Sequence, residues 1–198
     1  MMKSWVNNVK SSRWLGSASA KVVNVLMFNA AWFAILLTQS SLIAPIIVIL
    51  SLFAHFQVMG KGKPELLLIA GVTSLGFVID QTLFGTGVFN LAGKAALAPL
   101  WLTCLWPVFA TTLMHAFDWL QGKLILSSVV GAVGGCLSYI AGARLTLIDF
   151  GSALWGPLII AALWAIIFPL FLKISEKITE APSSDAKEGS PAKQRSQQ

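Results

Sequence analysis

The stretch APLWLTCLWPVFATTLMHAFDWL, from Ala98 to Leu120, decides how this chain folds. It is long enough to cross a bilayer, which takes about 20 predominantly apolar residues. It nevertheless contains a proline, two adjacent threonines, a histidine and an aspartate, and polar or ionisable side chains are costly in contact with lipid. Pro107 also lacks a backbone donor and crowds the carbonyl of Thr103, so we expect this span to bend there. The stretch is predicted to be a membrane span whose polar residues face other protein groups or a ligand.

The composition of the whole chain points the same way. Of its 198 residues, 56% are hydrophobic and only 11% are charged, whereas a soluble domain has about 25% charged residues. The net charge of +6 comes from basic residues near the two ends and in short loops, which is the distribution that orients a membrane protein. We therefore expect the lipid bilayer as the main partner and no nucleic-acid partner.

The fold class predicted from hydropathy is an all-α membrane protein with six transmembrane helices in one bundle, covering residues 21–173. The predicted spans are Lys21–Gln39, Ser41–Met59, Pro64–Leu83, Ala98–Leu120, Lys123–Ala143 and Phe150–Lys173. Residues 1–20 are predicted to form a basic amphipathic leader on the cytoplasmic face, with a flexible basic segment as the alternative. Residues 174–198 are polar and interrupted by proline, which predicts a disordered cytoplasmic tail.

The basic residues also predict the orientation. With the N-terminus inside, the outer side holds only Lys94 and Arg144, and the other twelve of the 14 lysines and arginines lie inside. Both termini are therefore expected in the cytoplasm, with the protein in a bacterial inner membrane. The longest outer loop, Phe84 to Leu97, keeps several apolar residues and is expected to pack on the bundle as a cap or a short re-entrant piece.

A polar stripe is predicted on the fourth span, where Thr111, His115 and Asp118 are spaced by four and three residues and so share one helical face. Counted from the inner end at about 1.5 Å per residue, Asn24 and His55 reach the same layer. The candidate polar site comprises Asn24, Asn29, His55, Thr111, Thr112, His115 and Asp118. Two interpretations stay open for the histidines: hydrogen bonds that only bridge helices, and a proton-linked or ligand-binding role.

No metal and no cofactor are predicted. The chain lacks an HxxxH or HxxEH spacing, which is how two metal ligands on one helix are usually recognised. Its two cysteines lie in separate apolar runs and form no CxxC pair, so neither a disulfide framework nor a cysteine metal site is expected.

A second polar group is predicted near the outer ends of the spans. It comprises Asp80, Tyr139, Arg144 and Asp149. Because an unpaired charge beside lipid is costly, we expect an ion pair between Asp80 and Arg144, with Asp149 as a competitor for the same arginine. A structural clamp is favoured over a catalytic pair.

The fifth span carries small residues at intervals of four, which let another helix approach closely. One row is Ser127, Gly131 and Gly135, and the other is Gly134, Ser138 and Gly142. The pattern predicts a central, tightly packed helix, with a homodimer face as the alternative.

Three segments resemble a known family. They are GFVIDQTLFGTGVF (Gly76–Phe89), APLWLTCLWPVFATTLMHAFDWL (Ala98–Leu120) and GGCLSYIAGARL (Gly134–Leu145). They are similar to a family of small bacterial inner-membrane proteins known only as a domain of unknown function, DUF2878, over about residues 20–173. The positions that match its pattern are Asp80, Trp101, Trp106, Thr112, His115, Trp119, Tyr139, Gly142 and Arg144. Cys136 stands where the pattern has proline. The resemblance implies an inner-membrane location and supplies no activity.

Three functions are compatible with the sequence. The first is a non-enzymatic membrane protein that binds or moves a small or amphiphilic molecule through the polar stripe. The second is an accessory or catalytic component of membrane-lipid modification, with His115 as acid or base. The third is a structural partner of another membrane protein. No soluble-enzyme motif is present, so we favour a non-enzyme and assign no catalytic residue. A binder should contain a cavity that reaches His115, and a structural partner should contain none.

Overall fold

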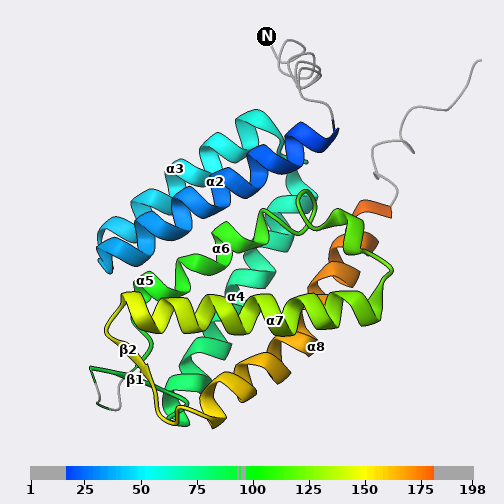
Figure 1. Ribbon diagram of the computed structural model, residues 1–198. Helices are drawn as coiled ribbons and strands as arrows, with labels where there is room; N and C mark the ends of the chain where they lie inside the picture. Colours follow the sequence, from blue (N-terminus) through cyan, green and yellow to red (C-terminus); the bar gives the residue numbers. More distant parts are fainter. Residues whose placement is uncertain (1–16, 93, 95–96, 181–198) are drawn as a thin grey trace, which may run out of the picture.

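The structure is built almost entirely of helices (Figure 1). It is a computed structural model that describes residues 17–92, 94 and 97–180. The helical elements are α2 (Ser17–Thr38), α3 (Ile43–Val58), α4 (Lys63–Gly85), α5 (Leu100–Thr103), α6 (Leu105–Ala110), the 3-10 turn η2 (Asp118–Leu120), α7 (Leu124–Leu145) and α8 (Trp155–Glu180). Two short strands, β1 (Phe89–Leu91) and β2 (Ile148–Phe150), pair antiparallel.

Four helices, α2, α4, α7 and α8, are long and apolar enough to cross a membrane. Two further apolar segments are shorter: α3 has 16 residues, and α5 with α6 covers Leu100–Ala110. Large apolar side chains are exposed along the outer faces of the helices, including Leu26, Leu37, Phe53 and Leu67. A helix that is apolar on the outside as well as the inside requires a lipid environment, so the fold indicates a helical membrane protein.

The span predicted from Ala98 to Leu120, with a bend at Pro107, is helical over only part of its length. The helix is interrupted at Cys104, continues to Ala110 and then gives way to turns up to η2. Pro107 supplies the physical reason for the interruption, because a proline removes one backbone donor and clashes with the carbonyl four residues earlier. At about 1.5 Å per residue, the helical part is only about half as long as a bilayer core is thick.

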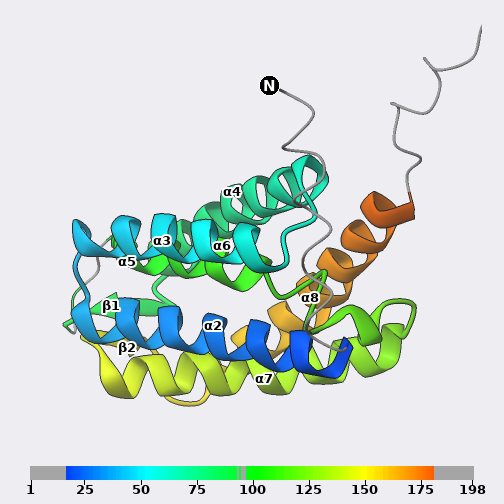
Figure 2. The ribbon, with the colours of Figure 1, turned by 90° about the horizontal axis from the view of Figure 1, so that it is seen from above.

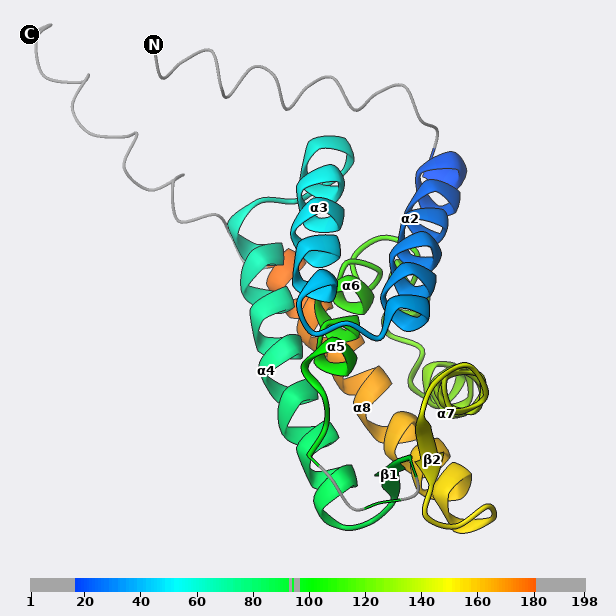
Figure 3. The ribbon, with the colours of Figure 1, turned by 90° about the vertical axis from the view of Figure 1, so that its left-hand side faces the viewer.

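This interrupted segment lies in the middle of the molecule. Figure 3 shows α5 and α6 surrounded by α2, α3, α4, α7 and α8. The turn region at 111–117 is mostly buried, and Leu113 and Met114 are among the most enclosed side chains. Irregular backbone is tolerated between apolar helices only where other protein groups cover it, and the surrounding helices provide that cover.

The other helices pack in pairs around this centre. Figure 2 shows α2 beside α3, joined by the short turn at residues 39–42, and Figure 1 shows α7 crossing α8. α2 and α3, which correspond to the first two predicted spans, therefore form a helical hairpin. α8 begins at Trp155 because residues 148–150 form β2, and it continues to Glu180. Residues 174–180 are thus helical and not part of a disordered tail. Residues 1–16 of the predicted leader and residues 181–198 of the predicted tail lie outside the described residues.

The strands β1 and β2 close one end of the bundle. Phe89 pairs with Phe150 across the two strands and is almost completely buried. Its ring stacks on Tyr139 of α7 at a centroid distance of 5.4 Å, and Phe84 is also buried. The apolar residues of the long loop therefore pack onto the bundle as a cap.

The small residues of α7 receive the aromatic side chains of α8. A Cβ atom on Gly135 would overlap the Trp164 ring, and one on Gly131 would lie 2.7 Å from Phe168 Cβ. These two glycines, with Ser127, are the buried positions of α7. Glycine at both positions therefore allows α7 and α8 to approach closely.

Two parts of the small-residue interpretation need correction. Gly134 is exposed, with no atom within 4 Å of an added Cβ, because it points away from α8. α7 itself is a peripheral helix that packs mainly on α8, and few of its residues are buried. Ser138 and Gly142 line a cavity, and a Cβ atom added on Gly142 would have only Leu36 of α2 nearby, at 4.0 Å.

The two kinds of glycine on α7 give a matched test. We expect Gly135→Leu to lower the free energy of unfolding by about 1–3 kcal/mol, since overpacking a filled contact costs that much. Gly134→Leu is the control, because its side chain enters open space. Thermal unfolding of both variants in the same detergent measures the difference, and equal stability of the two would contradict the packing described.

Candidate functional site

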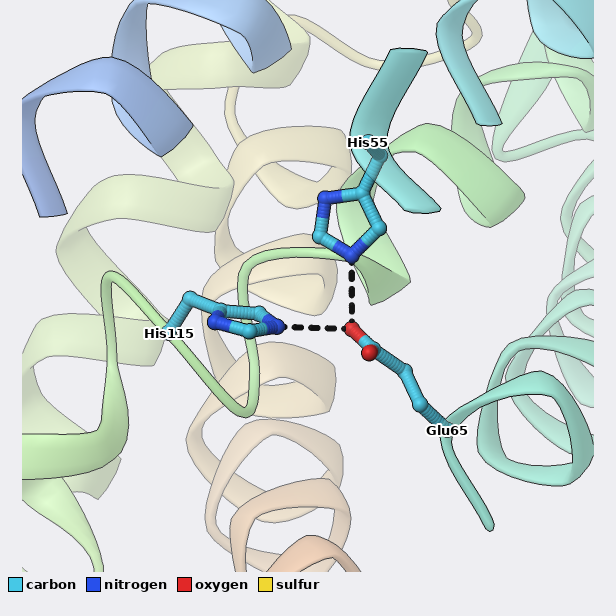
Figure 4. A group of neighbouring side chains, drawn as sticks. All are labelled: His55, Glu65 and His115. Atoms are coloured by element: carbon cyan, nitrogen blue, oxygen red, sulfur yellow. Dashed lines mark hydrogen bonds and ion pairs between the residues drawn. The ribbon is translucent and has the colours of Figure 1, made fainter. Parts of the chain in front are cut away.

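Two histidines and a glutamate from three separate segments meet inside the protein (Figure 4). His55 comes from the last turn of α3, Glu65 from the first turn of α4, and His115 from the turns after α6. The Nε2 atom of His55 lies 2.8 Å from Glu65 Oε1, and the Nε2 atom of His115 lies 2.9 Å from the same oxygen. We call these three residues the His–Glu–His cluster.

The cluster is enclosed by protein. The Glu65 side chain is fully buried, His55 is 2% exposed and His115 is 11% exposed. An isolated buried carboxylate is strongly unfavourable, so the two imidazoles and the backbone around Glu65 are what allow it to remain there. The small exposure of His115 leaves one side of the cluster close to the surface.

Lys61 supports the cluster from the turn between α3 and α4. Its backbone N–H donates to Glu65 Oε2 over 2.6 Å, which leaves Oε1 for the histidines. Its ammonium group donates to the Met114 carbonyl over 2.9 Å, directly beside His115. One residue thus fixes both the carboxylate and the loop that carries the second histidine.

Asn24 of α2 supports the same loop from the other side. Its Nδ2 donates to the Thr111 carbonyl, and its Oδ1 accepts from the Ala116 N–H, both over 3.2 Å. Asn24 is completely buried. The predicted layer of Asn24, His55, Thr111 and His115 is therefore one connected neighbourhood, although Thr111 takes part through its backbone.

The other predicted members of the polar site lie apart from the cluster. Asn29 donates to the Val25 carbonyl of its own helix, and the Thr112 hydroxyl donates to the Phe109 carbonyl. Asp118 forms an ion pair with Lys21 over 2.5 Å, with both side chains partly exposed. The assumed single helical face fails here, because residues 111–117 are turns and i, i+4 spacing no longer aligns side chains.

The predicted pair of Asp80 and Arg144 is not formed. Asp80 is completely buried, and its Oδ2 accepts a hydrogen bond from Trp106 Nε1 over 2.8 Å. Arg144 and Asp149 are exposed at the end of α7 and in β2, and neither has an ion-pair partner among the described residues. An exposed arginine has water available, so it gains little by pairing with a buried carboxylate.

Gly76 and Asp80 of α4 together position the indole ring of Trp106. A Cβ atom on Gly76 would overlap the indole ring, and Asp80, one turn later, accepts its N–H. The ring then stacks flat on Trp164 of α8, with centroids 5.6 Å apart and an interplanar angle of 1°. Tyr139 of the predicted outer group is a neighbour of this stack, 6.4 Å from the Trp164 ring.

The stacked tryptophans form one wall of a cavity of about 80 Å³. The cavity lies between α2 and α7, with α5 and α6 behind it. Aromatic rings dominate its lining, and the main ones are Phe28, Trp32, Trp101, Trp106, Tyr139 and Trp164. The residues of the His–Glu–His cluster are not part of this lining, so the cavity and the cluster are two separate features.

Glu65 is not among the site residues predicted from the sequence. An acid in the first turn of a helix is already explained by a favourable interaction with the helix dipole, and Glu65 has that position in α4. The sequence nevertheless contains a signal for Glu65. This acid lies in an apolar helix, ten residues after His55, and a short turn separates the two residues. Two helices joined by a short turn run antiparallel, so residues on either side of that turn come close together.

The long apolar helices define the protein as a helical membrane protein with two internal features, an aromatic cavity and a buried His–Glu–His cluster. The chain belongs to the family described as "Protein of unknown function (DUF2878)", whose family model matches residues 21–170. No curated protein and no solved structure matches the chain. The predicted resemblance is therefore confirmed, and the family carries no assigned activity.

The two asparagines of α2 test how strongly the loop of His115 depends on Asn24. We expect Asn24→Ala to lower the free energy of unfolding by about 1–3 kcal/mol, because it leaves a buried N–H and a buried carbonyl without partners. Asn29→Ala, which removes only a bond within α2, should change stability by no more than about 0.5 kcal/mol. Thermal unfolding in detergent compares them, and equal losses would show that the Asn24 bonds do not hold the loop.

Proposed function

We propose that this protein is a multi-pass protein of the bacterial inner membrane that binds an apolar chain of an amphiphilic molecule in its aromatic cavity. The observation that carries the proposal is the cavity between α2 and α7, in which half of the lining residues are aromatic. Ligand sites in proteins are typically concave and apolar, with a few polar groups that orient the ligand.

The size of the cavity limits what it can take. A volume of about 80 Å³ is well below the roughly 300–1,000 Å³ of sites that enclose drug-sized molecules. It exceeds the roughly 30 Å³ that one water occupies in the liquid. A narrow unbranched segment, such as part of an acyl chain, fits this space, whereas a whole phospholipid does not.

Polar groups at the cavity favour an amphiphile over a pure hydrocarbon. Trp164 lines the cavity, and its indole nitrogen is buried without a hydrogen-bond partner among the described residues. A buried unpaired donor costs about 1–3 kcal/mol, and a ligand oxygen that a rotation of the ring brings within reach of this nitrogen would remove that cost. Ser138 and Tyr139 belong to the same lining.

The helices that flank the cavity favour a ligand from the lipid phase. Leu26 and Phe33 of α2 are exposed, as are Val133 and Leu137 of α7. These apolar faces suit contact with acyl chains. A lipid-soluble ligand therefore reaches α2 and α7 without crossing water.

The cavity also helps to decide between the three functions that were predicted from the sequence. A structural partner was expected to have no cavity, so the cavity favours a binding protein. The cavity was expected to reach His115, yet His115 is absent from its lining. We therefore assign ligand binding to the aromatic cavity and not to the polar stripe of the fourth segment, and a role of His115 in lipid modification gains no support from it.

The membrane topology is part of the proposal. We infer six crossings, in which α3 and the segment of α5, α6 and the following turns cross in addition to the four long helices. Twelve of 14 basic residues then lie on the side of both termini, which is the cytoplasmic side by the positive-inside rule.

Reporter fusions test this topology. We expect a fluorescent reporter at the C-terminus to be active and an alkaline phosphatase at the same position to be inactive, since the first folds in the cytoplasm and the second requires the periplasm. A phosphatase fused in the loop after β1 should be active. Active phosphatase at the C-terminus would overturn the orientation.

Two glycine variants on α7 test the cavity. Gly142 lines it and has only Leu36 at 4.0 Å from an added Cβ, whereas Gly134 lies outside it. With a fatty acid that carries a photoactivatable group near its methyl end, we expect Gly142→Leu to lower covalent labelling about tenfold, equivalent to about 1.4 kcal/mol of binding. Gly134→Leu should be labelled like the unmodified protein.

Peptide mapping identifies where the label attaches in the unmodified protein. Labels should fall on the cavity-lining parts of α2 and α7. Equal labelling of the two glycine variants, or labels spread over the outer faces of the helices, would contradict binding in the cavity.

A further inference from the structure

We propose that the His–Glu–His cluster is a binding site for a divalent transition-metal ion, with Zn²⁺ as the best match. The chain contains two histidines, and the fold brings both to one carboxylate oxygen from different segments. The three ligand atoms lie within 4.8 Å of one another. None of the three side chains lines the aromatic cavity, so this proposal does not depend on ligand binding there.

The donor set fits zinc. Two imidazole nitrogens and one carboxylate oxygen form a ligand set that zinc uses in sites that keep a fourth position open. Zinc binds these atoms at about 2.0–2.2 Å, which places two ligands of a tetrahedral ion about 3.3 Å apart. The two N···O separations of 2.8 and 2.9 Å are shorter than this, and all three ligand atoms lie within 4.8 Å of one another, so the side chains must rotate out of their present hydrogen bonds to admit the ion.

The charge of the cluster also favours a cation. Glu65 is fully buried, and its carboxylate has only the two imidazoles and one backbone N–H as partners among the described residues. No lysine or arginine forms an ion pair with it there. A buried carboxylate without a counter-charge is costly. A divalent ion between the three side chains supplies that charge and leaves both histidines neutral, as metal ligation requires.

The surroundings hold the ligands in place. Groups that hydrogen-bond to metal ligands orient them and are a regular part of metal sites. Lys61 takes this role through its backbone N–H on Glu65 Oε2 and its ammonium group on the Met114 carbonyl. Glu65 Oε1 is therefore directed at the histidines, and the loop with His115 is tied to the turn before α4.

The position of the cluster gives an ion a route from water. Glu65 is in the first turn of α4, and Lys61 next to it is exposed. His115 is the most exposed of the three ligands. A metal ion therefore approaches from the end of the bundle at which α3 ends, on the His115 side.

The absence of an HxxxH motif does not argue against this site. That motif describes two ligands on one helix. Here His55 precedes Glu65 by ten residues and His115 follows it by fifty, so three segments each contribute a single ligand.

Metal binding by the purified full-length chain tests the proposal. The protein carries an affinity tag without histidine, is stripped with a chelator and is then titrated with Co²⁺, whose visible absorption reports four-coordinate ligation. We expect one Co²⁺ per chain, displaced by one Zn²⁺, and a higher melting temperature of the loaded protein. His55→Ala and His115→Ala should each weaken binding by about 100-fold, the upper end of the loss seen when even a supporting residue is removed.

Two further samples make the result decisive. Glu65→Gln keeps the size of the side chain but loses the charged ligand, so its binding should also weaken strongly. The double variant Cys104→Ser with Cys136→Ser removes every thiol of the chain and should bind Co²⁺ like the unmodified protein. If the histidine variants fail to fold, the spin-echo signal of coordinated imidazole in the Cu²⁺-loaded unmodified protein reports the histidines directly.

Three results would overturn the proposal. The first is less than stoichiometric Co²⁺ in the unmodified protein. The second is binding that survives in folded His55→Ala and His115→Ala. The third is Cu²⁺ bound without an imidazole signal. Each would leave the cluster as a hydrogen-bonded clamp between α3, α4 and the loop after α6.

Discussion

The structure depends on how the turns after α6 satisfy their backbone groups. Between apolar helices no bulk water is available, and each unpaired N–H or carbonyl costs several kcal/mol. The N–H groups of Thr112 and Leu113 donate to the Phe109 and Ala110 carbonyls at the end of α6, those of His115 and Phe117 both donate to the Thr112 carbonyl, and Ala116 donates to Asn24 Oδ1. The Thr111 and Met114 carbonyls accept from Asn24 and Lys61. The interrupted segment is stable because α2 and the turn before α4 supply hydrogen-bond partners that a regular helix would have provided from its own backbone.

The change from helix to turns at the end of α6 determines where the aromatic cavity and the His–Glu–His cluster lie. Had the helix continued past Ala110, His115 would stand one helical turn beyond Thr111 on the same face. The turns instead carry it to Glu65 and His55. Trp106 lies in α6, ahead of these turns, and it packs against Gly76 and bonds to Asp80 of α4. The cavity therefore borders the helical half of the segment, and the His–Glu–His cluster borders the irregular half.

Much of the fold could be predicted from hydropathy and turn residues. The short polar turn after Thr38 and the proline at the start of α4 mark helix boundaries that the structure confirms to within a few residues. The end of α6 could not be predicted, because its sequence stays apolar and only the partners of the backbone decide whether the helix continues. The same holds for Glu65, whose burial depends on two helices that lie beside it only in the folded chain.

The choice of partner for Asp80 shows a second limit. Counting residues along the spans placed Asp80 and Arg144 near the outer side of the membrane, and their opposite charges suggested an ion pair. Depth does not fix how each helix is rotated about its axis. α4 turns Asp80 inward to the Trp106 N–H, whereas Arg144 at the end of α7 points outward. An indole donor inside the protein then bonds Oδ2 of the carboxylate, and Oδ1 is buried without a hydrogen-bond partner among the described residues.

The hydrogen bonds of the central turns also bear on how the protein is made. Asn24 and Lys61 supply side chains that complete the backbone hydrogen bonding of these turns from outside the segment. Both precede the turns in the chain, so both have left the ribosome before residues 111–117 are synthesised. Translation therefore produces Asn24 and Lys61 before residues 111–117. The segment that cannot form all of its own backbone hydrogen bonds then enters the membrane after the residues that complete them.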